Sequence, residues 1–274
     1  MGVFIIMNIL VTLNTNYIKP LKVMLKSLFL NNPGENFTIY LMHSSLTQEE
    51  LEDLNIYIEN LGYALKDIYL ENTYFADAPT LLHYTKEMYY RLLAFKFLPK
   101  DLDRILYLDP DILVLNPIRR LYHMDFQGYM YAAAYHNIIP IKEINKIRLG
   151  AYDIDAYYNS GVLLMNLDLQ RQLIREQEIY KFVEQNKARL IMPDQDIINA
   201  LYGKYIKNLD EKLYNYDARY FSYYKIMSNG KWNMGYVLRN TVILHFCGKK
   251  KPWHNEYSGK FHSLYKHYEK LAIG

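Results

Sequence analysis

The chain of 274 residues contains a single cysteine, Cys247, and therefore cannot form an internal disulfide. Such sparing use of cysteine fits a reducing compartment such as the cytoplasm. No stretch is long and apolar enough to span a bilayer, and the apolar run at residues 3–13 lacks the basic start and small-residue cleavage site of a signal peptide. We therefore expect a cytoplasmic protein, with the inner face of a membrane as the alternative location.

A strong excess of charge is also missing. Lysine and arginine number 32 against 29 aspartates and glutamates, a formal net charge of +3, so nucleic acid is not expected as a partner. The sequence has no internal repeat, no low-complexity stretch and no linker rich in proline, glycine or serine. Its 51% hydrophobic and 22% charged residues are typical of one soluble globular domain and leave the oligomeric state open.

Apolar runs alternate with helical patterns along the chain. Thr47 and Glu50 have the spacing of a capping box at one helix start, and Gly62 marks the end of that helix. The β-α-β-α-β order predicts an α/β fold with a mostly parallel sheet and helices on both faces. The predicted strands are residues 8–13, 37–42, 129–135, 161–166 and 242–246, with others near Ile68 and Ile105, and the predicted helices are residues 18–30, 47–62, 85–98, 168–187 and 194–202.

The most informative segment is residues 104–115, where Asp109 and Asp111 interrupt an apolar run typical of a buried strand. Unpaired carboxylates are costly to remove from water. A divalent cation held between the two at the carboxyl end of the strand, where open α/β sheets bind ligands, would explain them. The alternative is a solvated turn with Pro110 as its turn residue.

A histidine closes another predicted strand. His245 follows an apolar run, and the chain then turns through Gly248 into three lysines that end at Lys251. Together with Asp109 and Asp111, the imidazole completes a set of ligands that suits Mn²⁺. A lysine and a metal beside a diphosphate would stabilise charge on a leaving group. The alternative is that His245 is a hydrogen-bonded core residue.

Three further polar segments supply candidate site residues. The first strand-to-helix turn, residues 12–17, has no glycine-rich fingerprint, and its side chains could bind a nucleotide base or simply cap the helix. Asn159 lies in the segment before the predicted strand at 161–166. Asp194 and Gln195 begin a predicted helix, where Asp194 is either the N-cap or, with Gln195, faces sugar hydroxyls.

Taken in order, these segments resemble glycosyltransferase family 8, which includes bacterial lipopolysaccharide galactosyl- and glucosyltransferases and glycogenin. The resemblance runs from about residue 8 to residue 254, nearly the whole chain. It implies a single Rossmann-like GT-A domain that binds a nucleotide sugar. The motifs that carry it are LYLDPD at 106–111, YNSGV at 158–162, DQD at 194–196 and HFCGKKKPWH at 245–254.

The resemblance also divides the chain. It places the GT-A glycosyltransferase domain at residues 1–255 and leaves a short C-terminal helical tail at residues 256–274. The apolar spacing from Phe261 to Leu271 predicts an amphipathic helix with lysines alongside. We expect the tail to pack on the domain, and peripheral contact with a membrane is the alternative.

The implied chemistry is transfer of a hexose, galactose or glucose, from a UDP-sugar to a glycan hydroxyl with retention of configuration and with Mn²⁺ or Mg²⁺. Asp109, Asp111 and His245 would hold the metal. Asn14 stands where relatives usually have aspartate against the uracil, and its amide oxygen still accepts a hydrogen bond. The implied donor-binding residues are Thr12, Asn14, Asn16, Arg91, Asp109, Asn159, Gly248 and Lys251.

The resemblance assigns the reacting groups too. Gln195 would lie at the reacting face of the sugar, with Asp194 beside it and Lys251 on the diphosphate. His83 and Cys247 would lie on the acceptor side. Because the obvious carboxylates would hold metal and Gln195 is a poor nucleophile, we favour front-face attack, in which the leaving phosphate takes the proton of the acceptor.

Two other functions remain open at this point. The chain could be a sugar-nucleotide or glycan-binding protein with little or no catalysis. It could also be a phosphatase of the haloacid-dehalogenase type, which places an Asp-x-Asp pair after an apolar strand. That pattern requires threonine or valine two residues after the second aspartate, where this chain has Leu113.

Overall fold

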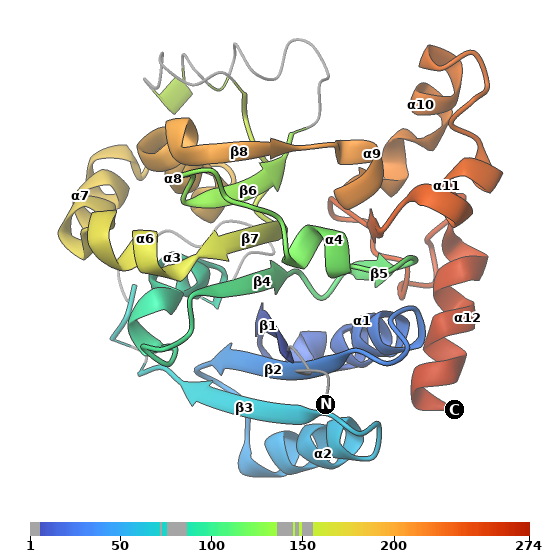
Figure 1. Ribbon diagram of the computed structural model, residues 1–274, viewed down its shortest axis with the longest axis horizontal. Helices are drawn as coiled ribbons and strands as arrows, with labels where there is room; N and C mark the ends of the chain where they lie inside the picture. Colours follow the sequence, from blue (N-terminus) through green and yellow to red (C-terminus); the bar gives the residue numbers. More distant parts are fainter. Residues whose placement is uncertain (1–5, 72, 76–86, 136–144, 146–147, 150–155) are drawn as a thin grey trace.

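The computed structural model describes residues 6–71, 73–75, 87–135, 145, 148–149 and 156–274. A seven-stranded sheet lies at its centre (Figure 1), and all neighbouring strands are parallel except at one strand, residues 162–166, which is antiparallel to both its neighbours. The predicted mostly parallel α/β sheet is confirmed. The strand order is β3 (Ala64–Tyr69), β2 (Asn36–His43), β1 (Ile6–Thr12), β4 (Arg104–Leu108), β7 (Val162–Asn166), β6 (Tyr131–Ala134) and β8 (Ile206–Leu209).

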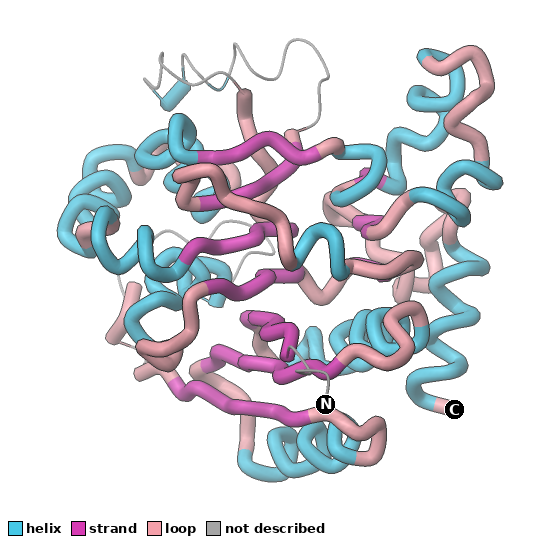
Figure 2. The backbone as a smooth tube through the Cα atoms, in the orientation of Figure 1, coloured by secondary structure: helices cyan, strands magenta, loops and turns pink. Residues whose placement is uncertain are grey.

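Helices cover both faces of this sheet, as predicted (Figure 2). Successive strand residues point to opposite faces, so Leu106 packs into one core and Tyr107 into the other. The first core lies under α1 (Ile18–Leu30) and α2 (Gln48–Glu59), and the second under α3 (Glu87–Phe97) and α8 (Pro193–Tyr202). The predicted capping box of α2 is present, since Thr47 and Glu50 each bind the backbone N–H of the other.

A second sheet of three short strands accounts for the position of the site. The apolar run through Asp109 and Asp111 is not one strand, because the chain turns at Pro110 and β5 (Ile112–Val114) joins this smaller sheet. There β5 pairs antiparallel with β10 (Ile243–His245), which also pairs with β9 (Tyr216–Asp217). His245 lies opposite Ile112 in this register, directly beside Asp111.

One predicted helix is wrong. Residues 168–187 form two helices, α6 (Leu167–Leu173) and α7 (Glu176–Asn186). The backbone is extended at Ile174 and Arg175, and the break allows the Ile174 side chain to be buried in the core beneath the sheet. The gain from burying an isoleucine outweighs the continuous helical pattern of the segment.

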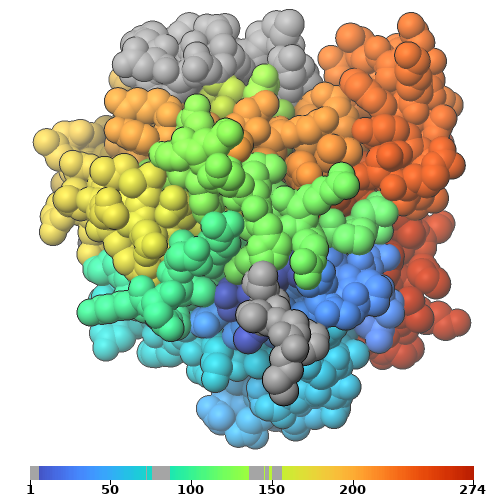
Figure 3. All heavy atoms as spheres, viewed as in Figure 1, coloured from blue at the N-terminus to red at the C-terminus, as the bar shows by residue number. Residues whose placement is uncertain are grey.

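Several short elements of the C-terminal third were not predicted, and they build the part of the molecule coloured orange to red on one side of Figure 3. None of the helices in the described part of the chain has the length and apolar character needed to cross a membrane. Besides β8 and β9, these C-terminal elements are α9 (Glu211–Tyr214), α10 (Phe221–Met227), α11 (Met234–Asn240) and two short 3₁₀ helices (Gly203–Tyr205 and Ala218–Tyr220). Two further short helices were not predicted either, α4 (Arg119–Tyr122) and a 3₁₀ helix at Thr15–Tyr17.

The predicted C-terminal helix is present as α12 (His262–Ile273), and it packs beside α1 (Figure 1). Phe261 and Tyr265 are buried in a core with Val23, and the Asn31 amide donates to the Tyr268 hydroxyl at 2.8 Å. The apolar face of the tail is therefore largely covered by the domain. The division of the chain at residue 255 stays a prediction, as does membrane contact.

Candidate active site

One cavity of about 450 Å³ gathers most of the predicted site residues. It opens at the carboxyl ends of β1 and β4, where Thr12 is the last residue of one strand and Asp109 follows the other. This is where open α/β sheets bind their ligands. The predicted residues that line it are Thr12, Asn14, Arg91, Asp109, Asp111, Asn159, Asp194, Gln195, His245, Cys247, Gly248 and Lys251.

Two predicted residues do not join this set. Asn16 is exposed and lies outside the cavity lining, and its backbone N–H donates to Asn14 Oδ1 at 3.1 Å. Asn14 therefore has the capping role that was the alternative interpretation, although it also lines the cavity. His83 lies outside the described residues. The roles assigned to all these side chains stay predictions.

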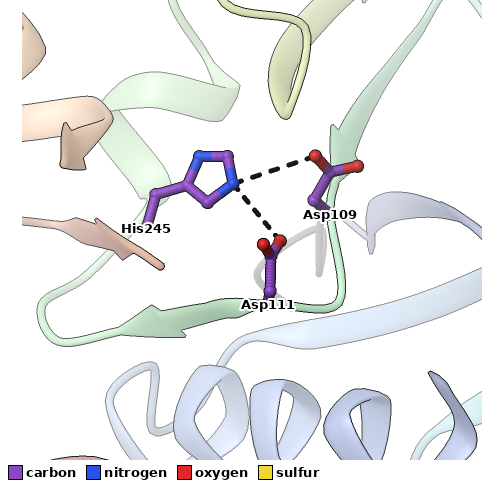
Figure 4. A group of neighbouring side chains, drawn as sticks. All are labelled: Asp109, Asp111 and His245. Carbon is purple, nitrogen blue, oxygen red and sulfur yellow. Dashed lines mark ion pairs between the residues drawn. The ribbon is translucent and has the colours of Figure 1, made fainter. Parts of the chain in front are cut away.

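Asp109, Asp111 and His245 form a compact cluster (Figure 4), with one ligand atom of each within 4.8 Å of the others. His245 Nε2 lies 3.2 Å from Asp111 Oδ1 and 3.8 Å from Asp109 Oδ2. Burial alone would lower the pKa of His245, but its interactions with Cys247 and Asp111 raise it well above its usual value. Two carboxylates and one imidazole whose ligand atoms lie this close together could hold a cation, and these donors fit Mn²⁺ or Mg²⁺.

Lys251 joins this cluster from the loop after β10. Its ammonium group donates to Asp111 and, at 3.1 Å, to the carbonyl oxygen of Phe246. Burial lowers the pKa of Lys251, but the charge of Asp111 outweighs this effect and raises it to about 12. Lys251 is therefore a fixed positive charge in the cavity at neutral pH.

Arg91 lies between two carboxylates of the cavity. Its guanidinium group is 3.0 Å from Asp109 Oδ1 and 3.2 Å from Asp194 Oδ2, and it lies 4.1 Å from the centre of the Tyr107 ring. It also donates to the carbonyl oxygen of Ser160 at 2.9 Å. This buried arginine ties the loop after β4 to the start of α8 and, through Ser160, to the segment before β7.

The start of α8 shows how Asp194 is used. The N-cap of the helix is Met192, and Asp196 accepts the backbone N–H groups of Ile191 and Met192, so the N-cap interpretation of Asp194 is wrong. Asp194 Oδ2 is buried and, apart from its 3.2 Å ion pair with Arg91, has no hydrogen-bond partner among the described residues. Burial raises the pKa of this carboxyl, and Arg91 opposes the rise. The oxygen is available to a hydroxyl donor in the cavity.

Several residues of the site were not predicted individually from the sequence. Glu87 and Arg219 also line the cavity, and Asn215 lies behind it as a hydrogen-bond partner of His245. These three belong to a helix start, a turn or an irregular segment whose local pattern carries no functional signal. Tyr17 and Lys249 line the cavity too, and they lie in segments that the sequence analysis had singled out. Only their position in the folded chain brings them to the site.

The fold is the GT-A fold of glycosyltransferases. A solved structure of the galactosyltransferase LgtC, in complex with donor and acceptor sugar analogues, superimposes with a TM-score of 0.84 at 22% identity. The superposition covers 98% of this chain and 97% of LgtC. This likeness shows the fold.

The chain belongs to glycosyl transferase family 8, whose family model matches residues 8–257. It is 27% identical over 254 residues to the lipopolysaccharide 1,2-glucosyltransferase of Escherichia coli, covering 89% of this chain and 72% of that protein. It is also 26% identical over 280 residues to general stress protein A of Bacillus subtilis, covering 96% and 93% of the two proteins. The predicted family is confirmed, which favours a glycosyltransferase over the phosphatase alternative.

Proposed function

We propose that the protein transfers glucose or galactose from a UDP-sugar to a hydroxyl of a bacterial cell-surface glycan, with retention of configuration and dependence on Mn²⁺ or Mg²⁺. The observation that carries the proposal is the Asp109, Asp111 and His245 cluster beside Lys251 in one cavity. The names of the glucosyltransferase of E. coli and of LgtC support the choice of hexose. Cys247 is the single cysteine of the chain and is buried, so no internal disulfide is possible, which supports a cytoplasmic location.

The donor would lie along the cavity from Thr12 and Asn14, at the base and ribose end, to Gly248 and Lys251 at the diphosphate. A divalent cation bound by the two aspartates and His245 would neutralise charge that develops on the leaving diphosphate. Lys251 adds a preorganised positive charge at the same end. Gly248 has a φ of +88°, a backbone conformation that glycine adopts without strain.

The transferred sugar would lie against the start of α8. Asp194 Oδ2 is a buried acceptor whose one contact among the described residues is the ion pair with Arg91, and a carboxylate oxygen can accept a sugar hydroxyl in addition. Gln195 Oε1 accepts from the side-chain amide of Asn159 at 3.1 Å and from the backbone N–H of Ser160 at 3.3 Å. Because these two donors already occupy the amide oxygen of Gln195, and because an amide oxygen is weakly nucleophilic, Gln195 is a poor candidate for a nucleophile.

The reaction that fits these groups is front-face substitution. The bond from the anomeric carbon to the phosphate oxygen of UDP breaks, and the acceptor oxygen bonds to the anomeric carbon on the same face. The acceptor proton passes to the leaving phosphate oxygen, so no protein base is needed. A covalent glycosyl adduct on Asp194 or Gln195, detected by mass spectrometry of a slow variant, would contradict this pathway.

The first test is release of UDP from a panel of UDP-sugars by the purified protein with Mn²⁺, with Mg²⁺ or with EDTA. We expect slow hydrolysis of one UDP-hexose that stops in EDTA. Metal-dependent binding of UDP without release from any sugar, even with glycan acceptors added, would instead favour a binding protein. Absence of UDP binding would refute the proposed donor.

Gly161 offers a test of the cluster that replaces none of its three side chains. A Cβ atom at this position would lie 2.5 Å from Asp109 Oδ2 and closer still to the His245 ring. We expect Gly161→Ala to displace both ligands and weaken Mn²⁺ binding at least about tenfold, because small misplacements at such sites are costly. Calorimetry with Mn²⁺ measures this. In the control Gly235→Ala, the nearest atom to the new Cβ is 3.2 Å away on Asn233, and binding should be unchanged.

A further inference from the structure

We propose that Asn215 is a positioning residue that orients His245 and Asn159 together and so ties the metal cluster to the sugar end of the cavity. The inference rests on the proposed function. Asn215 ends the short helix α9 and directly precedes β9. It is fully buried and is absent from the cavity lining, so its effect on a substrate must pass through other side chains.

The first contact of Asn215 fixes the histidine. Its Oδ1 atom lies 2.9 Å from His245 Nδ1, on the side of the ring away from Asp111. A carboxamide oxygen only accepts hydrogen bonds, so Nδ1 carries the proton in this contact. The lone pair of a neutral His245 is then on Nε2, the atom that faces Asp109 and Asp111. Such a partner on the far ring nitrogen is how proteins prepare a histidine to bind metal.

The second contact fixes the orientation of Asn215 itself. Its Nδ2 atom donates to Asn159 Oδ1 at 2.8 Å, and the same oxygen accepts the backbone N–H of Gly161 at 3.0 Å. A flipped Asn215 would place its oxygen against this acceptor and its amide group against the Nδ1–H of His245. Both contacts would then be lost in a buried site, where unmade hydrogen bonds are costly. Each contact therefore enforces the other.

The row of side chains continues to the sugar end of the cavity. Asn159 Nδ2 donates to Gln195 Oε1 at 3.1 Å. The amides of Asn215, Asn159 and Gln195 thus link a predicted metal ligand to the residue expected at the reacting face of the sugar. A change at Asn215 should therefore affect both metal binding at His245 and the sugar contacts of Asn159 and Gln195. The choice of the residue that replaces Asn215 can separate these two effects.

Two variants make this separation. Asn215→Leu removes both contacts, and we expect Mn²⁺ affinity to fall about 10- to 100-fold, the usual loss when such a partner of a ligand is removed. Asn215→Asp keeps an acceptor for His245 Nδ1 but cannot donate to Asn159. It should retain Mn²⁺ affinity within about threefold while kcat/KM for the UDP-hexose falls at least about tenfold, because one misplaced sugar contact is costly.

Calorimetry with Mn²⁺ and UDP-release kinetics measure these effects, with thermal unfolding as a check on folding. The matched control is Asn32→Leu, another buried asparagine with two hydrogen bonds, which should lose stability and keep Mn²⁺ affinity. If Asn215→Leu binds Mn²⁺ with wild-type affinity, the inference about Asn215 is overturned and the proposed function is not. If Asn215→Leu does not fold, unchanged kinetics of Asn215→Asp would overturn it. Wild-type protein that binds no Mn²⁺ would instead refute the proposed function.

Discussion

Asp111→Asn is expected to reduce Mn²⁺-dependent UDP release at least about a hundredfold, because a bound cation contributes several kcal/mol to stabilising a charged leaving group. Asp111 is 6% exposed, accepts a hydrogen bond from Lys251 and lies 3.2 Å from His245 Nε2. An amide at this position has nearly the same shape and lacks the charge. UDP release and Mn²⁺ calorimetry on the same preparation measure the effect.

The variant should also be less stable, because it leaves the buried charge of Lys251 without its carboxylate, a loss of about 3–5 kcal/mol for a buried pair. Activity is therefore compared at a temperature where unfolding curves show both proteins to be folded. Asp168→Asn, at an exposed carboxylate on α6, serves as the matched control and should behave as wild type. Full metal-dependent release by folded Asp111→Asn would remove Asp111 from the metal site.

The parts of the fold that the sequence predicted are those with strong local patterns. Strands β1 and β4 are continuous apolar runs, and the capping residues of α2 occur at fixed spacing. Asp109 and Asp111 could be recognised because two carboxylates in an apolar run need a physical reason. The meeting of His245 with them, more than 130 residues along the chain, was predicted from ligand chemistry and family resemblance, and the register of β5 with β10 accounts for it.

What local pattern could not predict depends on contacts made only after folding. The break at Ile174 arises because a buried side chain outweighs a helical pattern. Strand β9 has two residues, too few for any periodicity, yet it brings Asn215 behind His245. Arg91 was assigned to the donor, while its ion pairs with Asp109 and Asp194 appear only in the folded chain, where α3 packs against α8.

Arg91→Met is expected to destabilise the protein by about 3–5 kcal/mol at pH 7, because it leaves Asp109 and Asp194 without the cation between them. Methionine retains much of the apolar volume beside Tyr107, so most of the loss should come from charge. Urea unfolding of both proteins at pH 7 and pH 5 measures it. Arg119→Met, which removes an exposed pair with Glu35, is the control and should change little at either pH.

The pH dependence of the stability loss in Arg91→Met tests whether the Asp194 carboxyl causes it. Burial raises the pKa of Asp194 and Arg91 opposes the rise, so the variant should have a still higher pKa at this group. A carboxyl whose pKa is higher in the folded state than in the unfolded state, where it is about 3.9, lowers the stability at pH values above 3.9. This loss of stability disappears as the pH falls from the folded-state pKa to the unfolded-state pKa. The loss caused by Arg91→Met should therefore be smaller at pH 5 than at pH 7. An equal loss at both pH values would mean that Arg91 stabilises the site through its packing on Tyr107, and that its charge is used for the donor alone.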